Sequence, residues 1–152
     1  MKLIEDWDFD ILISHNRYTL SNRNADALFD LAKARGVVIM NAAPYAGGVL
    51  AKGTIEHPRY VYQEANDETL APIRKIEQAC ARHRVAPGAA ALQFSLRDPR
   101  VASTICGVTR PERVEQTIDW ATIDIPEALW AELSGLEPSF DDPEATRVFK
   151  AG

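Results

Sequence analysis

The chain has 152 residues, of which 46% are hydrophobic, a length that suits one domain or part of one. Its net charge is −5, with 17 Lys and Arg against 22 Asp and Glu, and this acidic balance argues against general nucleic-acid binding because phosphate neutralisation requires a basic surface. There is no apolar run of about 18 residues that would span a membrane, and the acidic first residues are unlike a signal peptide. The two cysteines, Cys80 and Cys106, lack metal-ligand spacing and are expected to be reduced, which predicts a cytoplasmic protein.

The first part of the chain has the pattern of a β–α–β unit. Residues 9–14 form a short apolar run rich in β-branched residues, which predicts a strand. Apolar residues then recur at helical spacing over residues 25–32, and Gly36 follows as an expected helix end. Residues 37–40 are uniformly apolar, a pattern typical of a parallel strand that is covered on both faces.

The rest of the chain begins with a long segment, residues 43–66, that is rich in Gly and Pro and shows no period. A loop of this length inside a compact domain is more often functional than idle. The next predicted elements are helices from Asp67 to about Arg84 and over residues 89–96, a strand over residues 101–106, and helices over residues 111–120 and 126–136. The polar tail, residues 137–152, is expected to be loosely attached, with Phe140 and Phe149 as the residues that could hold it to a surface.

This order of elements predicts three adjacent parallel strands with their helices on one side. One face of such a sheet stays uncovered, whereas parallel sheets are normally covered on both faces. Three strands leave little room for the reversed strand order of a doubly wound sheet. A (β/α)8 barrel covers the second face by closing on itself and takes about 250 residues, so the chain is predicted to be an α/β protein, a partial (β/α)8 TIM barrel.

The junction after the third predicted strand is the strongest candidate site. The strand ends at Cys106, Gly107 allows close backbone approach, and a helix begins at once, so its exposed N–H groups and positive dipole end could bind an anion. Arg110 and Arg113 lie in that first turn, where a guanidinium can bind a phosphate. A capped helix with two solvated arginines explains the same residues, and the pattern alone leaves both interpretations open.

Two helix starts also have the spacing of a capping box, in which a side chain three residues before a Glu bonds to the first turn. The pairs are Thr109 with Glu112 and Asp124 with Glu127, each with a proline in the first turn. Both side chains are therefore expected to cap their helices.

Three segments, residues 41–50, 92–101 and 107–115, resemble aldo-keto reductases. A fourth, residues 14–20, is similar to the branch of that family that acts on sugars as L-fucose, D-threo-aldose and L-galactose 1-dehydrogenases. The resemblance runs from about Phe9 to Leu136. It implies that the strands are the sixth, seventh and eighth of the family's barrel, followed by a C-terminal helix, so that residues 1–136 form the C-terminal part of the barrel and residues 137–152 a tail.

The resemblance also implies a nicotinamide cofactor, NADP or NAD, bound across the C-terminal face of the barrel. Gln116 and Thr117 replace the family's usual Glu-Asn pair, and Ala42 stands where many members have an aromatic residue against the nicotinamide. The positions that match the family's cofactor-binding residues are Pro44, Tyr45, Ala46 and Gly47 along the pyrophosphate and nicotinamide ribose; Gly107, Val108, Thr109, Arg110 and Arg113 at or beside the adenosine 2′-phosphate; Gln116 and Thr117 at the adenine; and His15 near the nicotinamide carboxamide.

The catalytic Asp, Tyr, Lys and His of the family lie on its first four strands and match nothing in this chain, so no catalytic residue is predicted. The first hypothesis is the cofactor-binding portion of an NAD(P)-dependent oxidoreductase that reduces a carbonyl or oxidises a sugar or alcohol. The second is a non-catalytic half-barrel or remnant. The third is assembly, either by self-association or with a separate N-terminal half, which would cover the open sheet face. Whether the chain alone is an enzyme stays open, and neither a metal nor a nucleic-acid or membrane partner is expected.

Overall fold

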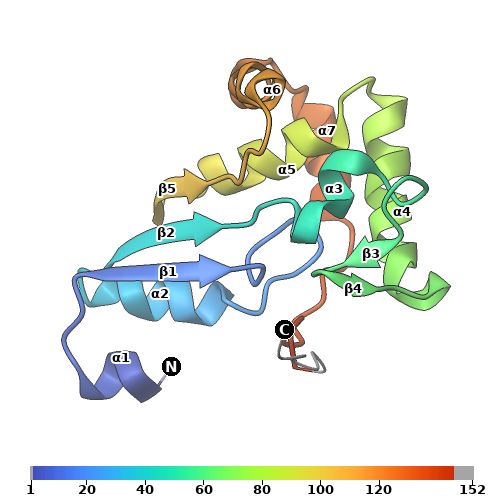
Figure 1. The fold of residues 1–152 in the computed structure, drawn as a ribbon. Helices are drawn as coiled ribbons and strands as arrows, with labels where there is room; N and C mark the ends of the chain where they lie inside the picture. The colour runs from blue at the N-terminus through green and yellow to red at the C-terminus, as the bar shows by residue number, and fades with distance from the viewer. Residues whose placement is uncertain (1, 146–152) are drawn as a thin grey trace.

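A three-stranded parallel sheet forms the centre of the molecule, of which the computed structural model describes residues 2–145. Strands β1 (Ile11–His15), β2 (Val38–Ala42) and β5 (Val101–Ile105) lie in the order β1-β2-β5 (Figure 1). Ile11 lies opposite Val38 and Met40 opposite Ser103, with a shift in register of β2 against β5 just before Met40. The prediction of three adjacent parallel strands is confirmed, although β1 begins at Ile11 rather than at Phe9.

Two helices cover one face of this sheet. In Figure 1, α2 (Asp26–Ala34) and α5 (Pro87–Leu96) pass behind the strands. Phe29 of α2 is fully buried against Ile39 of β2, and Phe94 of α5 packs on the same cluster. A short helix that the sequence pattern did not predict, α1 (Lys2–Asp6), adds Ile4 to this core.

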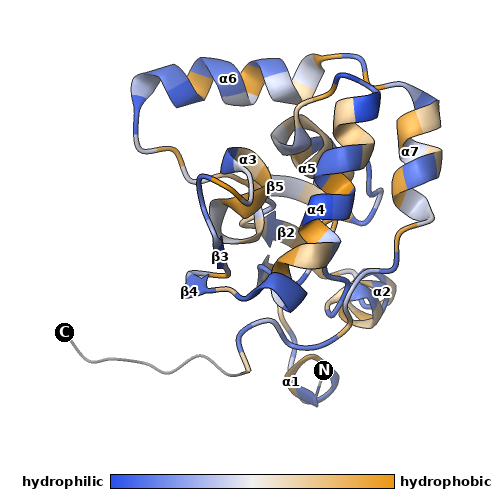
Figure 2. Ribbon diagram, turned by 90° about the vertical axis from the view of Figure 1, so that its right-hand side faces the viewer, coloured by the Kyte–Doolittle hydropathy of each residue, from blue (hydrophilic) through white to orange (hydrophobic). Residues whose placement is uncertain are grey.

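Three further helices build a second core beside the sheet. α3 (Val49–Lys52) and α4 (Asp67–Arg82) pack against α5, and α7 (Glu127–Ser134) lies next to α4 (Figure 2). The helical spacing of Leu70, Ile73 and Ile76 turns all three inward, and each is almost fully buried. None of the helices within residues 2–145 is long and apolar enough to cross a membrane.

The helix starts follow the sequence prediction, but their caps do not. α6 (Pro111–Thr122) begins after Arg110 and α7 begins after Pro126, and neither N-terminus receives a hydrogen bond from a capping side chain. The predicted capping boxes of Thr109 and Asp124 are therefore wrong, because both residues lie before the position from which a side chain can reach the first turn. The helix that does have a side-chain cap is α4, where Asn66 accepts a hydrogen bond of 2.9 Å from the Thr69 N–H.

Residues 43–66, which show no period in the sequence, contain short ordered elements. A 3-10 turn, η1 (Ala46–Gly48), leads into α3, and a small antiparallel hairpin follows, with strands β3 (Arg59–Tyr60) and β4 (Gln63–Glu64). The two residues at its tip, Val61 and Tyr62, have φ values of 48° and 69°, which are unfavourable for residues with a Cβ. The tip is thus a strained turn.

The face of the sheet opposite the helices is not covered by the described residues. Side chains alternate along each strand, so one set points to the helices and the other to solvent. The second set is apolar: Ile11 is 54% exposed, Ile13 59%, Val38 44% and Ile105 41%. These four side chains, with Met40 between them in the register, are called the open face below. The expectation that residues 37–40 are covered on both faces is not met within residues 2–145, since Val38 is exposed whereas Ile39 is fully buried.

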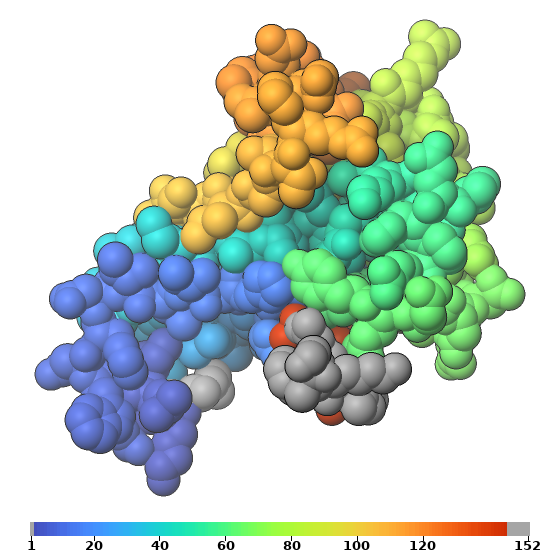
Figure 3. Space-filling model, in the orientation of Figure 1, coloured from blue at the N-terminus to red at the C-terminus, as the bar shows by residue number. Residues whose placement is uncertain are grey.

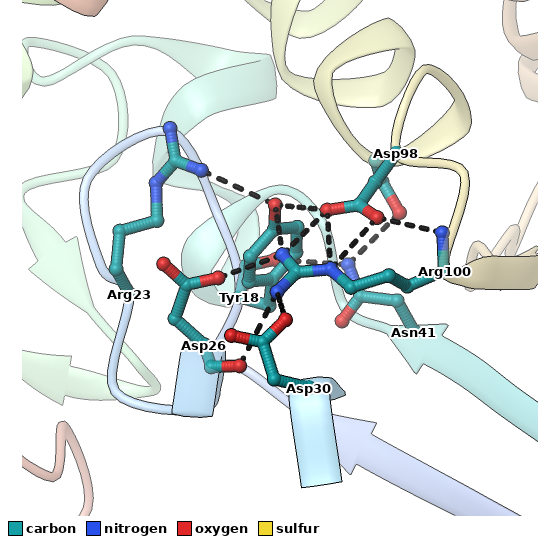
Figure 4. Close-up of polar contacts among 8 residues, drawn as sticks. Tyr18, Arg23, Asp26, Asp30, Asn41, Asp98 and Arg100 are labelled. Carbon is teal, nitrogen blue, oxygen red and sulfur yellow. Dashed lines mark hydrogen bonds and ion pairs between the residues drawn. The ribbon is translucent and has the colours of Figure 1, made fainter. Parts of the chain in front are cut away.

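A cluster of charged side chains joins the loop after β1 to the turn between α5 and β5 (Figure 4). The guanidinium of Arg100 lies between three carboxylates, 2.7 Å from Asp98, 2.7 Å from Asp26 and 2.6 Å from Asp30. The Tyr18 hydroxyl donates a hydrogen bond to Asp98 and accepts one of 3.1 Å from Arg100. Burial, together with the neighbouring Asp98, raises the pKa of Tyr18 to about 12, so the phenol stays neutral and keeps its proton for Asp98.

This cluster predicts a loss of stability in acid. Burial alone would raise the pKa of Asp98, but hydrogen bonds from Arg100 and Tyr18 outweigh that effect and lower it from an ordinary 3.8 to about 2. A carboxyl group with a lowered pKa stabilises the fold fully above its unfolded pKa and loses that contribution as the pH falls through the folded one. We expect Asp98 to contribute about 2 kcal/mol at neutral pH and to lose it between about pH 4 and pH 2. Urea unfolding at several pH values measures this loss, and in Asp98→Asn the acid-dependent part should shrink by the same amount.

The first residues of the predicted tail are attached to the loop after β1. The Ser139 carbonyl accepts a hydrogen bond of 2.8 Å from the Arg23 N–H, and its own N–H donates one of 3.0 Å to the Ser21 carbonyl. The Asn22 side chain donates a further bond of 2.9 Å to the Asp141 carbonyl. The expected loose attachment is therefore wrong for residues 137–145, because main-chain groups of the tail pair with the loop; residues 146–152 lie outside the described part.

Candidate functional site

A cleft of about 360 Å³ opens at the C-terminal ends of the strands. One wall is the loop between β5 and α6 with the first turns of α6, and the other is the segment after β2 with α3 and the hairpin tip. In Figure 3 the orange residues of the first wall stand above the teal residues of the second. The lining residues are Ala43, Tyr45, Gly47, Gly48, Ala51, Lys52, Tyr62, Gly107, Val108, Thr109, Arg113, Gln116, Thr117 and Trp120.

Most of the sequence-predicted site residues come together in this cleft. Those that line it are Tyr45, Gly47, Gly107, Val108, Thr109, Arg113, Gln116 and Thr117. Pro44 and Ala46 are fully buried and do not line it. Arg110 is exposed at the start of α6 outside the lining, and His15 lies beyond the rim, where it contacts Tyr62.

The charges that line the cleft favour an anion. Lys52 and Arg113 are its two charged lining residues within the described chain, although the protein as a whole has a net charge of −5. The Gln116 side chain holds Arg113 through a hydrogen bond of 2.6 Å to its guanidinium. No side chain caps α6, so its first turn, which adjoins the lining residues Thr109 and Arg113, receives no side-chain hydrogen bond.

Tyr45 lines the cleft with its ring, while its polar atom is buried. Its hydroxyl is buried and forms no hydrogen bond of good geometry with the described residues, although Cys106 and Thr117 lie close to it. Burial, reinforced by Cys106, raises the pKa of this phenol well above its usual value, so it is neutral at physiological pH. The ring is fixed by an edge-on contact with Trp120, at 5.9 Å between ring centroids.

Sequence reasoning missed six lining residues, which are Ala43, Gly48, Ala51, Lys52, Tyr62 and Trp120. Three of them, Gly48, Ala51 and Lys52, directly follow the predicted Pro44–Gly47 stretch, and their nearness in the chain was the available signal. Tyr62 gave no such signal, since its segment has no period and the hairpin that carries it was not predicted. Trp120 lies one turn beyond Gln116 and Thr117 on α6, and the helical period could have placed it on their face.

Comparison with known proteins places the chain in a family. The sequence profile described as "Aldo/keto reductase family" matches residues 1–137. The chain is similar to pyridoxal 4-dehydrogenase of Microbacterium luteolum, with 30% identity over 86% of this chain and 38% of that protein. It is similar also to D-threo-aldose 1-dehydrogenase of Pseudomonas sp, with 32% identity over 88% of this chain and 41% of that protein. The chain thus spans about 40% of the length of these relatives.

Solved structures show the same fold. The apo and holo forms of an aldo-keto reductase from Bacillus halodurans superpose with TM-scores of 0.70 and 0.71 at 15% identity. They cover 97% of this chain, whereas the chain covers 50% and 49% of theirs. The three parallel strands and their helices are therefore part of a TIM barrel. With the profile match over residues 1–137, this chain belongs to the aldo/keto reductase family, a family of oxidoreductases.

Proposed function

We propose that this chain is the C-terminal, cofactor-binding portion of an NAD(P)-dependent aldo-keto reductase that reduces a carbonyl or oxidises a sugar or alcohol. In this proposal β1, β2 and β5 are the sixth, seventh and eighth strands of the barrel. Residues 1–136 form the barrel portion and residues 137–152 the tail. The observation that carries the proposal is a cleft with two cations and no lining carboxylate among the described residues, in a member of this family.

The residues of the cleft fit a dinucleotide with phosphate groups. Arg113, the N–H groups at the start of α6 and the loop from Gly107 to Arg110 would hold the adenosine 2′-phosphate and its surroundings. The stretch from Pro44 to Gly47, of which Tyr45 and Gly47 line the cleft, would lie along the pyrophosphate and ribose, and Gln116 and Thr117 beside the adenine. When bound, the nicotinamide supplies or accepts the hydride.

The proposed reaction also needs a proton donor, because the alkoxide that forms on hydride transfer must be neutralised. The family's catalytic Asp, Tyr, Lys and His match no position in this chain. We therefore expect this chain alone to bind the cofactor without turning over a carbonyl substrate. The two free cysteines, Cys80 and Cys106, agree with a reducing, cytoplasmic location.

Fluorescence titration with NADPH tests the binding. Arg113→Gln should weaken NADPH binding about tenfold, since a charge-assisted hydrogen bond to a phosphate is worth about 1.5 kcal/mol or more. Arg74→Gln is the matched control, because Arg74 lies on the exposed side of α4 and pairs with Asp67. The same weakening in both variants would assign the effect to net charge rather than to the cleft. Failure of the unmodified chain to bind NADPH at millimolar concentration would refute the cofactor proposal.

A second candidate is a non-catalytic half-barrel or remnant that assembles with other chains. The open face favours it, because exposed apolar side chains on three adjacent strands mark an interface. A chain can both assemble and bind the cofactor. The NADPH titration therefore tests cofactor binding, and a measurement of oligomeric state tests assembly.

A further inference from the structure

The hairpin tip holds Tyr62 at the mouth of the cleft. The neighbouring Val61 is fully buried, and its N–H lies 3.4 Å from the Ala46 carbonyl. Below the tip, a Cβ on Gly47 would come within 2.9 Å of backbone atoms of Val61 and Tyr62, so a glycine is needed for this close approach. The positive φ values of the tip persist because this packing holds them. Tyr62 is thus placed by the backbone, and its side chain remains 43% exposed while lining the cleft.

The ring of Tyr62 lies beside that of His15, which ends β1. The two rings are nearly parallel, 18° apart, with centroids separated by 5.9 Å. A hydrogen bond of 3.3 Å joins the Tyr62 hydroxyl to Nε2 of His15, and the His15 side chain is 44% exposed. In Figure 3 the green atoms of the hairpin meet the blue atoms at the end of β1. Two half-exposed, nearly parallel rings from distant segments therefore lie against each other at the side of the cleft that Tyr62 lines.

The other nitrogen of His15 is held by the C-terminal tail. Nδ1 lies 3.4 Å from a carboxylate oxygen of Glu144, which also accepts a hydrogen bond of 3.1 Å from the Asn16 side chain. The second oxygen of Glu144 lies 3.5 Å from the Arg17 guanidinium. Burial would raise the pKa of Glu144, but Asn16 and Arg17 outweigh it and lower it, so the carboxylate is ionised at neutral pH. Glu144, together with the Asn16 amide 3.2 Å from Nδ1, thus holds the imidazole with Nε2 beside the Tyr62 hydroxyl.

The residue of the neighbouring strand that pairs with His15 is small. Ala42 of β2 pairs with His15 in the register, and its methyl group offers no ring. We propose that Tyr62 and His15 form the surface on which the nicotinamide ring of the cofactor stacks, with Glu144 as a positioning residue that acts through His15. This inference rests on the proposed function, because it assumes that the cleft binds a nicotinamide cofactor. It concerns the end of that cofactor opposite to the phosphate proposed to bind Arg113.

Binding measurements with two ligands test this inference separately from the proposed function. NADPH carries the nicotinamide, whereas adenosine 2′,5′-bisphosphate carries the adenine and 2′-phosphate without it. In the full chain, Tyr62→Ala should weaken NADPH binding about three- to tenfold, the size of an aromatic stacking contact, and leave binding of the bisphosphate unchanged. Tyr62→Phe should retain most of the affinity. Phe140→Ala is the matched control, because Phe140 is an exposed aromatic outside the cleft lining.

The positioning role of Glu144 is tested by a double-mutant cycle with NADPH as ligand. Glu144→Ala should weaken NADPH binding less than His15→Ala does, and the double variant should bind no more weakly than His15→Ala alone. Additive losses, or an equal effect of Tyr62→Ala on both ligands, would overturn the inference while leaving the proposed function intact. If the unmodified chain binds neither ligand, the proposed function fails and this inference fails with it. Circular dichroism checks that each variant remains folded.

Discussion

Replacing Asp98 with alanine should lower the free energy of unfolding by about 3 kcal/mol. The Asp98 side chain is only 8% exposed and forms three kinds of contact: the ion pair with Arg100, a hydrogen bond from the Arg100 N–H and the hydrogen bond from Tyr18. Its removal leaves the Tyr18 hydroxyl facing the guanidinium groups of Arg23 and Arg100 with no acceptor for its own proton. The cost is large because a buried polar group without its partner loses more than an ordinary hydrogen bond contributes. Urea denaturation at neutral pH measures it.

The control for this substitution is Glu115→Gln, which changes an exposed carboxylate in the middle of α6. Its effect should stay within about 0.5 kcal/mol, as for other exposed side chains. Tyr18→Phe should cost less than Asp98→Ala, since Asp98 then keeps Arg100. Equal stability of Asp98→Ala and the unmodified chain would show that Asp26 and Asp30 hold Arg100 without Asp98.

Removing apolar side chains from the open face should convert a self-associating chain into a monomer. Each exposed isoleucine gains about 1.5–3 kcal/mol when it is buried against a partner, so Ile11, Ile13, Val38 and Ile105 together favour association strongly. We expect light scattering to give the unmodified chain a mass above the 16.8 kDa of one copy. The double variant Ile11→Thr/Ile13→Thr should shift that mass toward the monomer while keeping β-branched residues in the strand.

Leu3→Thr provides the comparison, because Leu3 is 69% exposed on α1, away from the sheet. It should leave the mass unchanged. An unmodified chain that is monomeric and does not bind a hydrophobic dye would contradict the interpretation of the open face as an interface.

Some residues of the candidate site could be predicted from the sequence, and others could not. The junction from Gly107 to Arg113 was identifiable because it joins a strand end to a helix start, whereas residues 44–47, Gln116 and Thr117 were assigned from the resemblance to aldo-keto reductases. Parallel strands bring their carboxyl ends to one edge of the sheet, where both stretches lie. Tyr62 and Lys52 were not identifiable, because they reach the cleft through elements that leave no periodic trace in the sequence. The caps of α6 and α7 were mispredicted because spacing alone does not determine at which residue a helix begins.

The sequence by itself determined the strands, the principal helices and the parallel order of the sheet. Short-range rules govern these features: the period of apolar residues, the ends of helices and strands at Gly and Pro, and right-handed crossovers between parallel strands. Only the tertiary structure decided that Glu144 reaches His15 and that a strained tip holds Tyr62 beside it. Such contacts join residues far apart in the chain, and packing of the whole molecule selects them, so no local pattern records them.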